Sequence, residues 1–166
     1  MAAIVVTGFT EYLDLLDLTE RQVKTMCGRA IYPGAKVVAN ECKKQLQELR
    51  THDELFRITE KYGALREGPT KRQKKFLIES MGIADMRRNG DGWDVKLGFD
   101  GYNDIVSKRW PKGQPNAMIA RSVNKGTSFM RAQPFMDKTI RASEKICIVA
   151  IENEFNKQLE KYWGRQ

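Results

Sequence analysis

Apolar residues recur at helical spacing over two long stretches of the chain. The first stretch runs from Val23 to Leu49, and its three- and four-residue spacing is typical of an amphipathic helix. Thr19 precedes it, with Gln22 three residues later, which favours a capping box at the start of the helix. Because Pro33-Gly34 interrupts the stretch, we expect either one long kinked helix or two helices broken there.

The second long stretch opens at Gln133-Pro134-Phe135 and continues to Trp163. Pro134 suits the first position of a helix, because its missing N–H would have no partner there. We expect a break near residues 142–144 to divide this stretch into two helices. Shorter segments also have a helical pattern, and they are Phe9–Leu18, Asp53–Tyr62, Lys71–Ser80 with Thr70 as its cap, and Ala117–Val123.

The middle of the chain has the two-residue alternation of a β-strand. From Trp93 to Phe99 every second residue is apolar, which predicts a strand with one buried face. Residues 89–92 read Asn-Gly-Asp-Gly, and these dipeptides accommodate the positive φ angles of hairpin turns. Met81–Arg88 is the expected partner strand. The predicted fold is α+β, a small antiparallel sheet with a central hairpin packed against long N- and C-terminal helices.

The length of 166 residues favours one domain, residues 1–166, with 51–69 and 102–116 as loop-rich insertions. The longest apolar run, Ile146 to Ile151, is far shorter than the roughly 20 residues that cross a bilayer. The apolar opening is also too short for a secretory signal. We therefore expect a soluble protein made and kept in the cytosol, with its three cysteines, Cys27, Cys42 and Cys147, reduced and mostly buried.

The chain is strongly basic, with 29 Lys and Arg against 21 Asp and Glu and a net charge of +8. Two clusters fall in segments that are candidates for contact with DNA or an acidic partner, namely Lys71, Arg72, Lys74 and Lys75, and then Lys108, Arg109 and Lys112. Trp110 lies within the second cluster, in a loop that we expect to be exposed. Such clusters attract phosphate or acidic protein surfaces, but many are simply solvated faces.

Residues for catalysis are scarce. The single histidine, His52, lies in an irregular segment, and no Gly-x-Ser-x-Gly or Walker-type motif occurs. The cysteines lack the close pairing of zinc sites. We therefore predict no catalytic residue, no metal site and no cofactor, and a hydrolase using His52 is only a third candidate function.

Several motifs in the second half of the chain occur in a distinctive order. Trp93 to Tyr102 reads Trp-Asp-Val-Lys-Leu-Gly-Phe-Asp-Gly-Tyr, Pro115-Asn116 and Ile119 to Val123 follow, and then come Gly126-Thr127-Ser128 and Ala132 to Phe135. This series resembles the neck or tail-completion family of long-tailed bacteriophages, also called head–tail joining or minor tail proteins. The chain departs from the family pattern in the extended stretch from about Thr51 to Gly68 and at Met130-Arg131.

The resemblance implies a non-enzymatic virion protein, made in the bacterial cytoplasm, that forms a homo-oligomeric ring of six subunits at the head–tail junction. Its partners would be head-closure, tail-terminator or tail-tube proteins, with transient contact to DNA in the axial channel and no membrane. A ring needs two different surfaces of one subunit to meet. The candidate interface residues are Trp110, Arg121, Gly126, Thr127, Ser128, Gln133, Pro134 and Phe135, although the turn and cap residues among them also have a purely structural explanation.

A second function from another class stays open. Basic residues beside an aromatic side chain are how proteins hold single strands of nucleic acid. Lys71 to Lys75 together with Trp110 would give a cytosolic accessory protein that binds nucleic acid without sequence preference.

Overall fold

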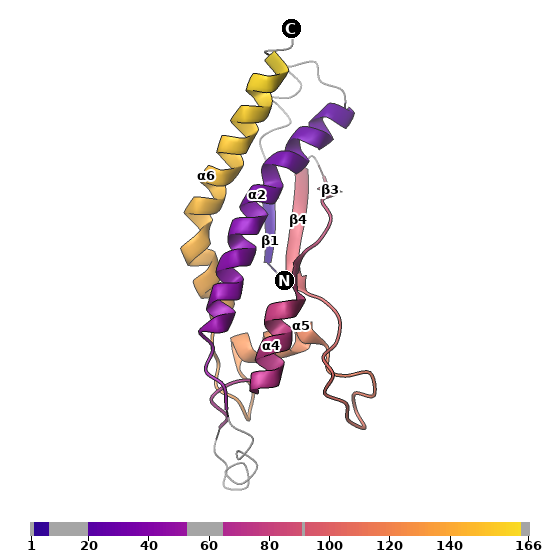
Figure 1. The fold of residues 1–166 in the computed structure, drawn as a ribbon, viewed down its shortest axis with the longest axis vertical. Coiled ribbons are helices and arrows are strands. Elements are labelled where there is room, and N and C mark those ends of the chain that lie inside the picture. Colours follow the sequence, from indigo (N-terminus) through magenta and orange to yellow (C-terminus); the bar gives the residue numbers. More distant parts are fainter. Residues whose placement is uncertain (1, 7–19, 53–64, 91, 164–166) are drawn as a thin grey trace. The chain divides into compact units, whose positions relative to one another are not determined.

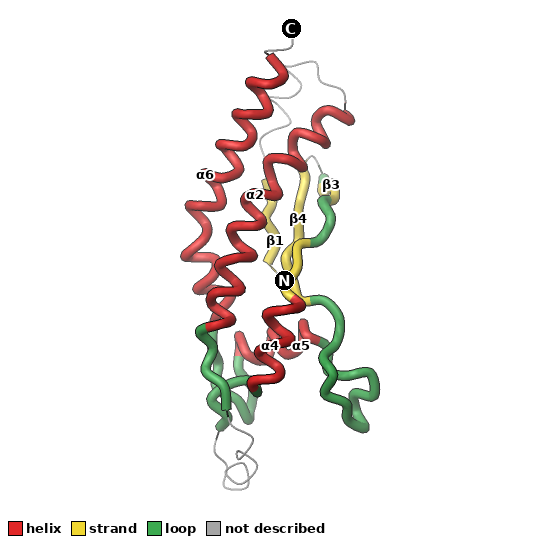
Figure 2. The backbone as a smooth tube through the Cα atoms, viewed as in Figure 1, coloured by secondary structure: helices red, strands yellow, loops and turns green. Residues whose placement is uncertain are grey.

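The computed structural model describes residues 2–6, 20–52, 65–90 and 92–163. These residues form an α+β fold with long helices near the two ends of the chain and a small sheet (Figures 1 and 2). The segments predicted as helical at Phe9–Leu18 and Asp53–Tyr62 lie outside the described residues, as does most of the 51–69 insertion. No helix in the described ranges is both long enough and apolar enough to cross a membrane.

The chain divides into two compact units, and we describe each by itself. Unit 1 comprises Met1–Asn40, Ile83–Leu97 and Ala142–Gln166, and unit 2 comprises Glu41–Gly82 and Gly98–Arg141. Helix α2 (Glu20–Gln47), strand β4 (Gly92–Phe99) and helix α6 (Phe135–Trp163) each contribute residues to both units.

The sheet is centred on β4. Strand β1 (Ala2–Val6) pairs with it antiparallel, Ala2 opposite Leu97 and Val6 opposite Trp93. Strand β3 (Arg87–Asn89) also pairs with β4, and Asn89 lies opposite Gly92 across the two-residue turn. Gly90 in this turn has a φ of 59°, a conformation that glycine adopts without strain. The predicted central hairpin is confirmed, whereas β1 was not foreseen as a strand.

The prediction of one continuous strand over Met81–Arg88 is wrong, because this segment forms two strands. Residues 84–86 separate strand β2 (Met81–Ile83) from strand β3. The amide of Ala84 donates to the carbonyl of Lys96 at 2.8 Å, and Arg87 lies opposite Asp94. The chain therefore advances three residues from Ala84 to Arg87 while β4 advances only two, from Lys96 to Asp94, as in a β-bulge. The amide of Met86 at this interruption donates instead to the Tyr32 hydroxyl at 3.1 Å.

Helix α2 continues through Pro33 as one helix, which decides between the two alternatives for this segment. Helix α6 is also continuous, so the break predicted near residues 142–144 is wrong. Ser143 is buried, and so is Cys147 one turn later. Serine is only slightly unfavourable in a helix. The packing of this buried face is therefore sufficient to keep the helix continuous.

The core of unit 1 joins α2 to the sheet. Ile31, Ala35 and Val95 are fully buried together, and Ile83 and Met86 pack against them. On another part of α2, Gly34 leaves room for α6, because a Cβ atom there would lie 2.6 Å from Cγ1 of Ile151. The two helices therefore approach closely only because residue 34 has no side chain.

Unit 2 contains the helices α4 (Lys71–Ser80) and α5 (Asn116–Lys125), which lie against each other. The cap predicted at Thr70 is confirmed, since its hydroxyl accepts from the Gln73 amide at 3.0 Å and its own amide donates to Gln73 Oε1 at 3.0 Å. Phe135 is 2% exposed, and its ring meets that of Phe99 edge to face. Phe135 therefore belongs to the core of unit 2.

We predict that Gly34→Ala lowers the free energy of unfolding by about 1–3 kcal/mol, because the new methyl group overlaps Ile151 in a packed core. Gly28→Ala in the same helix is the matched control. Its methyl group would meet only the terminal methyl group and sulfur of Met86, at 3.2 and 3.6 Å, and the flexible Met86 chain can move aside. Urea denaturation of both variants measures the difference, and an equal loss of stability would contradict this account of the helix contact.

Candidate functional site

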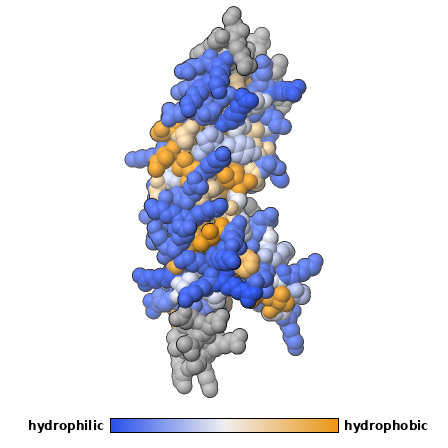
Figure 3. Space-filling model, in the orientation of Figure 1, coloured by the Kyte–Doolittle hydropathy of each residue, from blue (hydrophilic) through white to orange (hydrophobic). Residues whose placement is uncertain are grey.

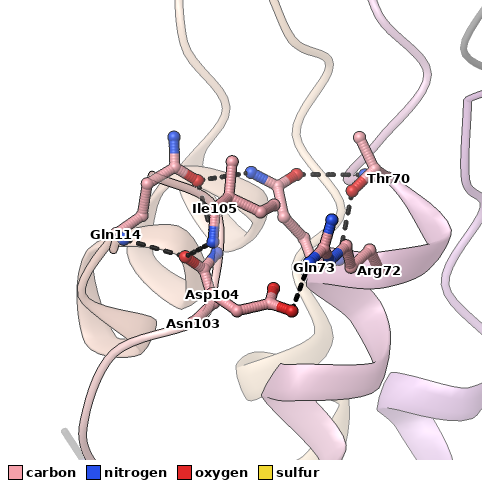
Figure 4. A network of polar contacts seen from close by, with 7 residues as sticks. All are labelled: Thr70, Arg72, Gln73, Asn103, Asp104, Ile105 and Gln114. Atoms are coloured by element: carbon pink, nitrogen blue, oxygen red, sulfur yellow. Dashed lines mark hydrogen bonds and ion pairs between the residues drawn. The ribbon is translucent and has the colours of Figure 1, made fainter. Parts of the chain in front are cut away.

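Residues 103–114 form a loop after β4 whose base is tied by hydrogen bonds, and we call it the cationic loop (Figure 4). Asn103 is buried at the base. Its side-chain oxygen accepts from the backbone amides of Ile105 at 3.0 Å and Gln114 at 2.8 Å. Its backbone amide donates to the backbone carbonyl of Gln114 at 2.9 Å. One asparagine thus closes both ends of the loop.

Helix α4 holds the same base from the side. Gln73, the capping-box residue of α4, donates from Nε2 to Oε1 of Gln114 at 2.9 Å. Arg72 forms an ion pair with Asp104 (Figure 4). The hydrogen bond from Arg72 lowers the pKa of the Asp104 carboxyl below its usual value. The ion pair therefore stays formed at neutral pH and is lost only when the pH falls through that lowered pKa.

The tip of the cationic loop is a tight turn that presents positive charge. Ser107 and Trp110 exchange backbone hydrogen bonds of 3.1 and 3.0 Å, so Lys108 and Arg109 occupy the two central positions of the turn. Both are exposed, and the Arg109 guanidinium lies over the Trp110 ring, 5.6 Å from its centroid. Val106, just before the turn, is 67% exposed. The tip thus combines cations with apolar surface.

Gly113 closes the loop and tolerates no side chain. Its φ is 92°, in the region that favours glycine, and a Cβ atom would overlap the carbonyl oxygen of Asn103. Lys112 beside it is exposed and completes the second basic cluster of the sequence.

The first basic cluster, on α4, is largely engaged within the chain. Lys74 donates from Nζ to the carbonyls of Gln47 at 2.6 Å and Leu49 at 2.9 Å, and so caps the C-terminal end of α2. Lys75 lies 3.8 Å from Glu79, one turn along the helix. Arg72 is held by Asp104, and Lys71 is exposed. The cluster therefore has a structural role that its sequence pattern did not indicate.

Gly126-Thr127-Ser128 forms the expected turn after α5. Gly126 has a φ of 75° and ends the helix. Thr127 and Met130 exchange backbone hydrogen bonds of 2.9 and 3.3 Å, which places Ser128 in an exposed turn. Arg121 is exposed on α5. The turn residues thus meet the structural role that the sequence allowed.

Gln133 joins three segments of unit 2. Its Nε2 donates to the carbonyls of Arg50 at 3.0 Å and Glu67 at 2.9 Å, and its Oε1 accepts from the Arg50 amide at 2.9 Å. The backbone amide of Gln133 donates to the Val123 carbonyl at 2.8 Å. Pro134 follows, but it lies just before α6 and not at its first position. Gln133 therefore acts as an internal clamp, a role that the sequence did not indicate.

The residues considered for chemistry are His52 and the three cysteines. The His52 ring nitrogen Nδ1 hydrogen-bonds the Gly68 carbonyl oxygen at 2.6 Å. Burial raises the pKa of all three cysteine thiols, that of Cys42 to about 11, and each cysteine is buried and reduced. Within the described part of the chain, no three His, Cys, Asp or Glu side chains gather where they could hold a metal ion.

No protein-family model, curated protein or solved structure matches this chain. The site is therefore defined by its geometry, which is that of an exposed, cation-bearing loop on a hydrogen-bonded base. Sequence reasoning found the tip, through its charge and Trp110. It missed the base residues Asn103, Gln73 and Gln114, although an asparagine at the start of a loop is a known signal for side-chain closure of a turn.

We predict that Gln133→Leu lowers the free energy of unfolding by about 1–3 kcal/mol, because three hydrogen bonds between segments are lost. The control is Gln45→Leu, because in the described part of the chain the side chain of Gln45 donates to Glu41 on the same helix face, a contact worth about 0.2–0.5 kcal/mol. Urea denaturation compares the two variants. Similar stability losses would show that Gln133 is not a clamp.

Proposed function

We propose that this chain is a structural subunit of the head–tail junction of a long-tailed bacteriophage, where it forms a ring between the head-closure layer and the tail. The proposal rests first on the resemblance of the ordered motifs between Trp93 and Phe135 to the neck or tail-completion family. The observation that carries it is the cationic loop, an exposed tip fixed on a base of partly buried hydrogen bonds. Such a surface is suited to docking against another protein.

The proposed role is mechanical. A cyclic ring requires that one surface of each subunit fits a different surface of the next. A loop whose base is already ordered loses little conformational entropy when it docks, so more of the contact energy appears as affinity. The hydrogen bonds of Asn103 and Gln73 therefore favour a stiff contact between subunits or with an adjacent connector layer.

The proposal includes an axial channel through which the genome passes. The excess of positive charge, +8 for the whole chain, would then favour transient contact with phosphate or with acidic neighbours. In this role the protein belongs to the virion, carries out no reaction and needs no cofactor.

The ring is tested on the purified chain and on particles. We expect sedimentation velocity to show a closed oligomer, six subunits being the stoichiometry that the resemblance implies, and electron microscopy to show a ring with a central hole. In phage particles, a subunit carrying a small tag should be imaged between head and tail. Filled heads that join tails normally in the absence of this chain would overturn the proposal.

The alternative, a cytosolic nucleic-acid-binding protein, would use Lys71 to Lys75 together with Trp110. Because Arg72, Lys74 and Lys75 all have partners within unit 2, we expect the free chain to bind DNA only non-specifically, with a dissociation constant of about 10⁻⁴–10⁻⁶ M and with binding that weakens steeply as salt is added. Electrophoretic titrations across salt concentrations should give the same result for Lys71→Gln/Lys75→Gln. Tight binding by a monomer, lost in that variant, would support the alternative instead.

A further inference from the structure

Helix α6 has an apolar segment that the described residues of unit 1 cover on one side only. Six consecutive residues of this helix, Ile146 to Ile151, are apolar and so occupy all of its sides. Cys147 and Ile151 are buried, whereas Ile146, Ile148 and Val149 are 60, 50 and 52% exposed. Figure 3 shows apolar surface over the middle of α6. A helix that is apolar on all sides is normally covered on all sides, so this face indicates a contact with another molecule.

The exposed face of α6 also carries a defined charge pattern. Glu144, Ile148 and Glu152 follow one another at four-residue spacing, which places them on one ridge of the helix. Both glutamates are exposed. This ridge, an isoleucine with a carboxylate one turn away on each side, is hereafter the acidic ridge. Val149 extends its apolar part on the neighbouring ridge, next to Lys145.

The tip of the cationic loop has the opposite pattern. Val106 is exposed and Trp110 is half-buried, and Lys108 and Arg109 lie between them in the turn. The only carboxylate of the loop, Asp104, is paired with Arg72 at the base. The charges that remain at the tip are therefore all positive, and they complement two glutamates that flank an isoleucine.

We infer that, in the proposed ring, the cationic loop of one copy docks on the acidic ridge of the next. Val106 and Trp110 would pack on Ile148, while Lys108 and Arg109 would face Glu144 and Glu152. Because the loop and the ridge are different surfaces of one chain, the contact is heterologous, which is the kind that a cyclic ring needs. The inference rests on the proposed function, and it names the two surfaces that meet.

The two kinds of contact have different roles. Exposed ion pairs contribute little to stability, so the affinity comes mainly from covering Ile148 and its apolar neighbours. Charge complementarity fixes the register and excludes wrong pairings, since like charges that are brought together are strongly unfavourable. Reversing the charges on one surface should therefore disrupt the contact, and reversing those on the other surface as well should restore it.

Disulfide trapping tests the contact between copies. Val106→Cys and Ile148→Cys are made in separate chains of different size, mixed, and oxidised mildly near pH 8. The native cysteines should compete poorly, because they are buried and their thiol pKa values are raised. We expect a mixed dimer in large excess over that from Val106→Cys with Asn156→Cys, an exposed position further along α6. Equal yields from the two mixtures would overturn the inference.

Charge exchange gives a second, independent readout. The loop variant Lys108→Glu/Arg109→Glu and the ridge variant Glu144→Lys/Glu152→Lys should each weaken self-association about tenfold or more. A chain carrying all four substitutions should regain most of the association, as measured by sedimentation equilibrium. Circular dichroism checks that each variant is folded. Four substitutions that weaken association additively, without recovery, would contradict the pairing.

The outcomes separate this inference from the proposed function. Rings seen at the head–tail junction without a trapped mixed disulfide would support the proposed function and contradict the contact between the loop and the ridge. A mixed disulfide and charge rescue in a protein that particles do not contain would support the contact and overturn the proposed function. If DNA binding is lost on loop reversal while association is unchanged, the loop serves nucleic acid and the inference is wrong.

Discussion

Unit 2 depends on one constraint, which is that peptide groups outside regular elements must find hydrogen-bond partners. Its loops and helix ends leave amides and carbonyls that no neighbouring strand can satisfy, and burying such groups without partners is costly. Side chains supply the partners. Gln133 pairs with Arg50 and Glu67, Lys74 with the carbonyls that end α2, and Asn103 with both ends of the cationic loop. The exposed tip can be stiff because these pairs hold its base.

This constraint explains why the sequence misled where it did. Lys74 and Gln133 belong to patterns that indicate a surface role, a basic cluster and a short motif. A single chain does not reveal whether a long polar side chain turns to solvent or back to a carbonyl, because that depends on segments far away in sequence. Lys74 reaches residues 25 and 27 positions earlier, and Gln133 reaches across 83 and 66 positions.

Local pattern was sufficient where local physics decides the structure. The alternation from Trp93 to Phe99, the turn at residues 89–92 and the cap at Thr70 were all predictable, because each depends on neighbours within a few residues. The interruption between β2 and β3 was not. It arises from an offset of one residue against β4 and an amide satisfied by Tyr32 of α2, and no short window of sequence contains either fact. Likewise, the burial of Ser143 within the continuous helix α6 could not be read from its immediate neighbours in the sequence.

Helix α6 shows that the described part of the chain can be well packed and still leave apolar side chains exposed. Cys147 and Ile151 are buried on the inward face, whereas Ile146, Ile148 and Val149 keep half or more of their surface exposed. Exposed apolar surface reduces solubility, and polar residues at these positions would cost less than at a fully buried one. Their presence is therefore best understood through contact with another molecule. The glutamates that flank Ile148 limit the choice of partner, because they favour a basic surface with apolar groups at its centre, such as the tip of the cationic loop.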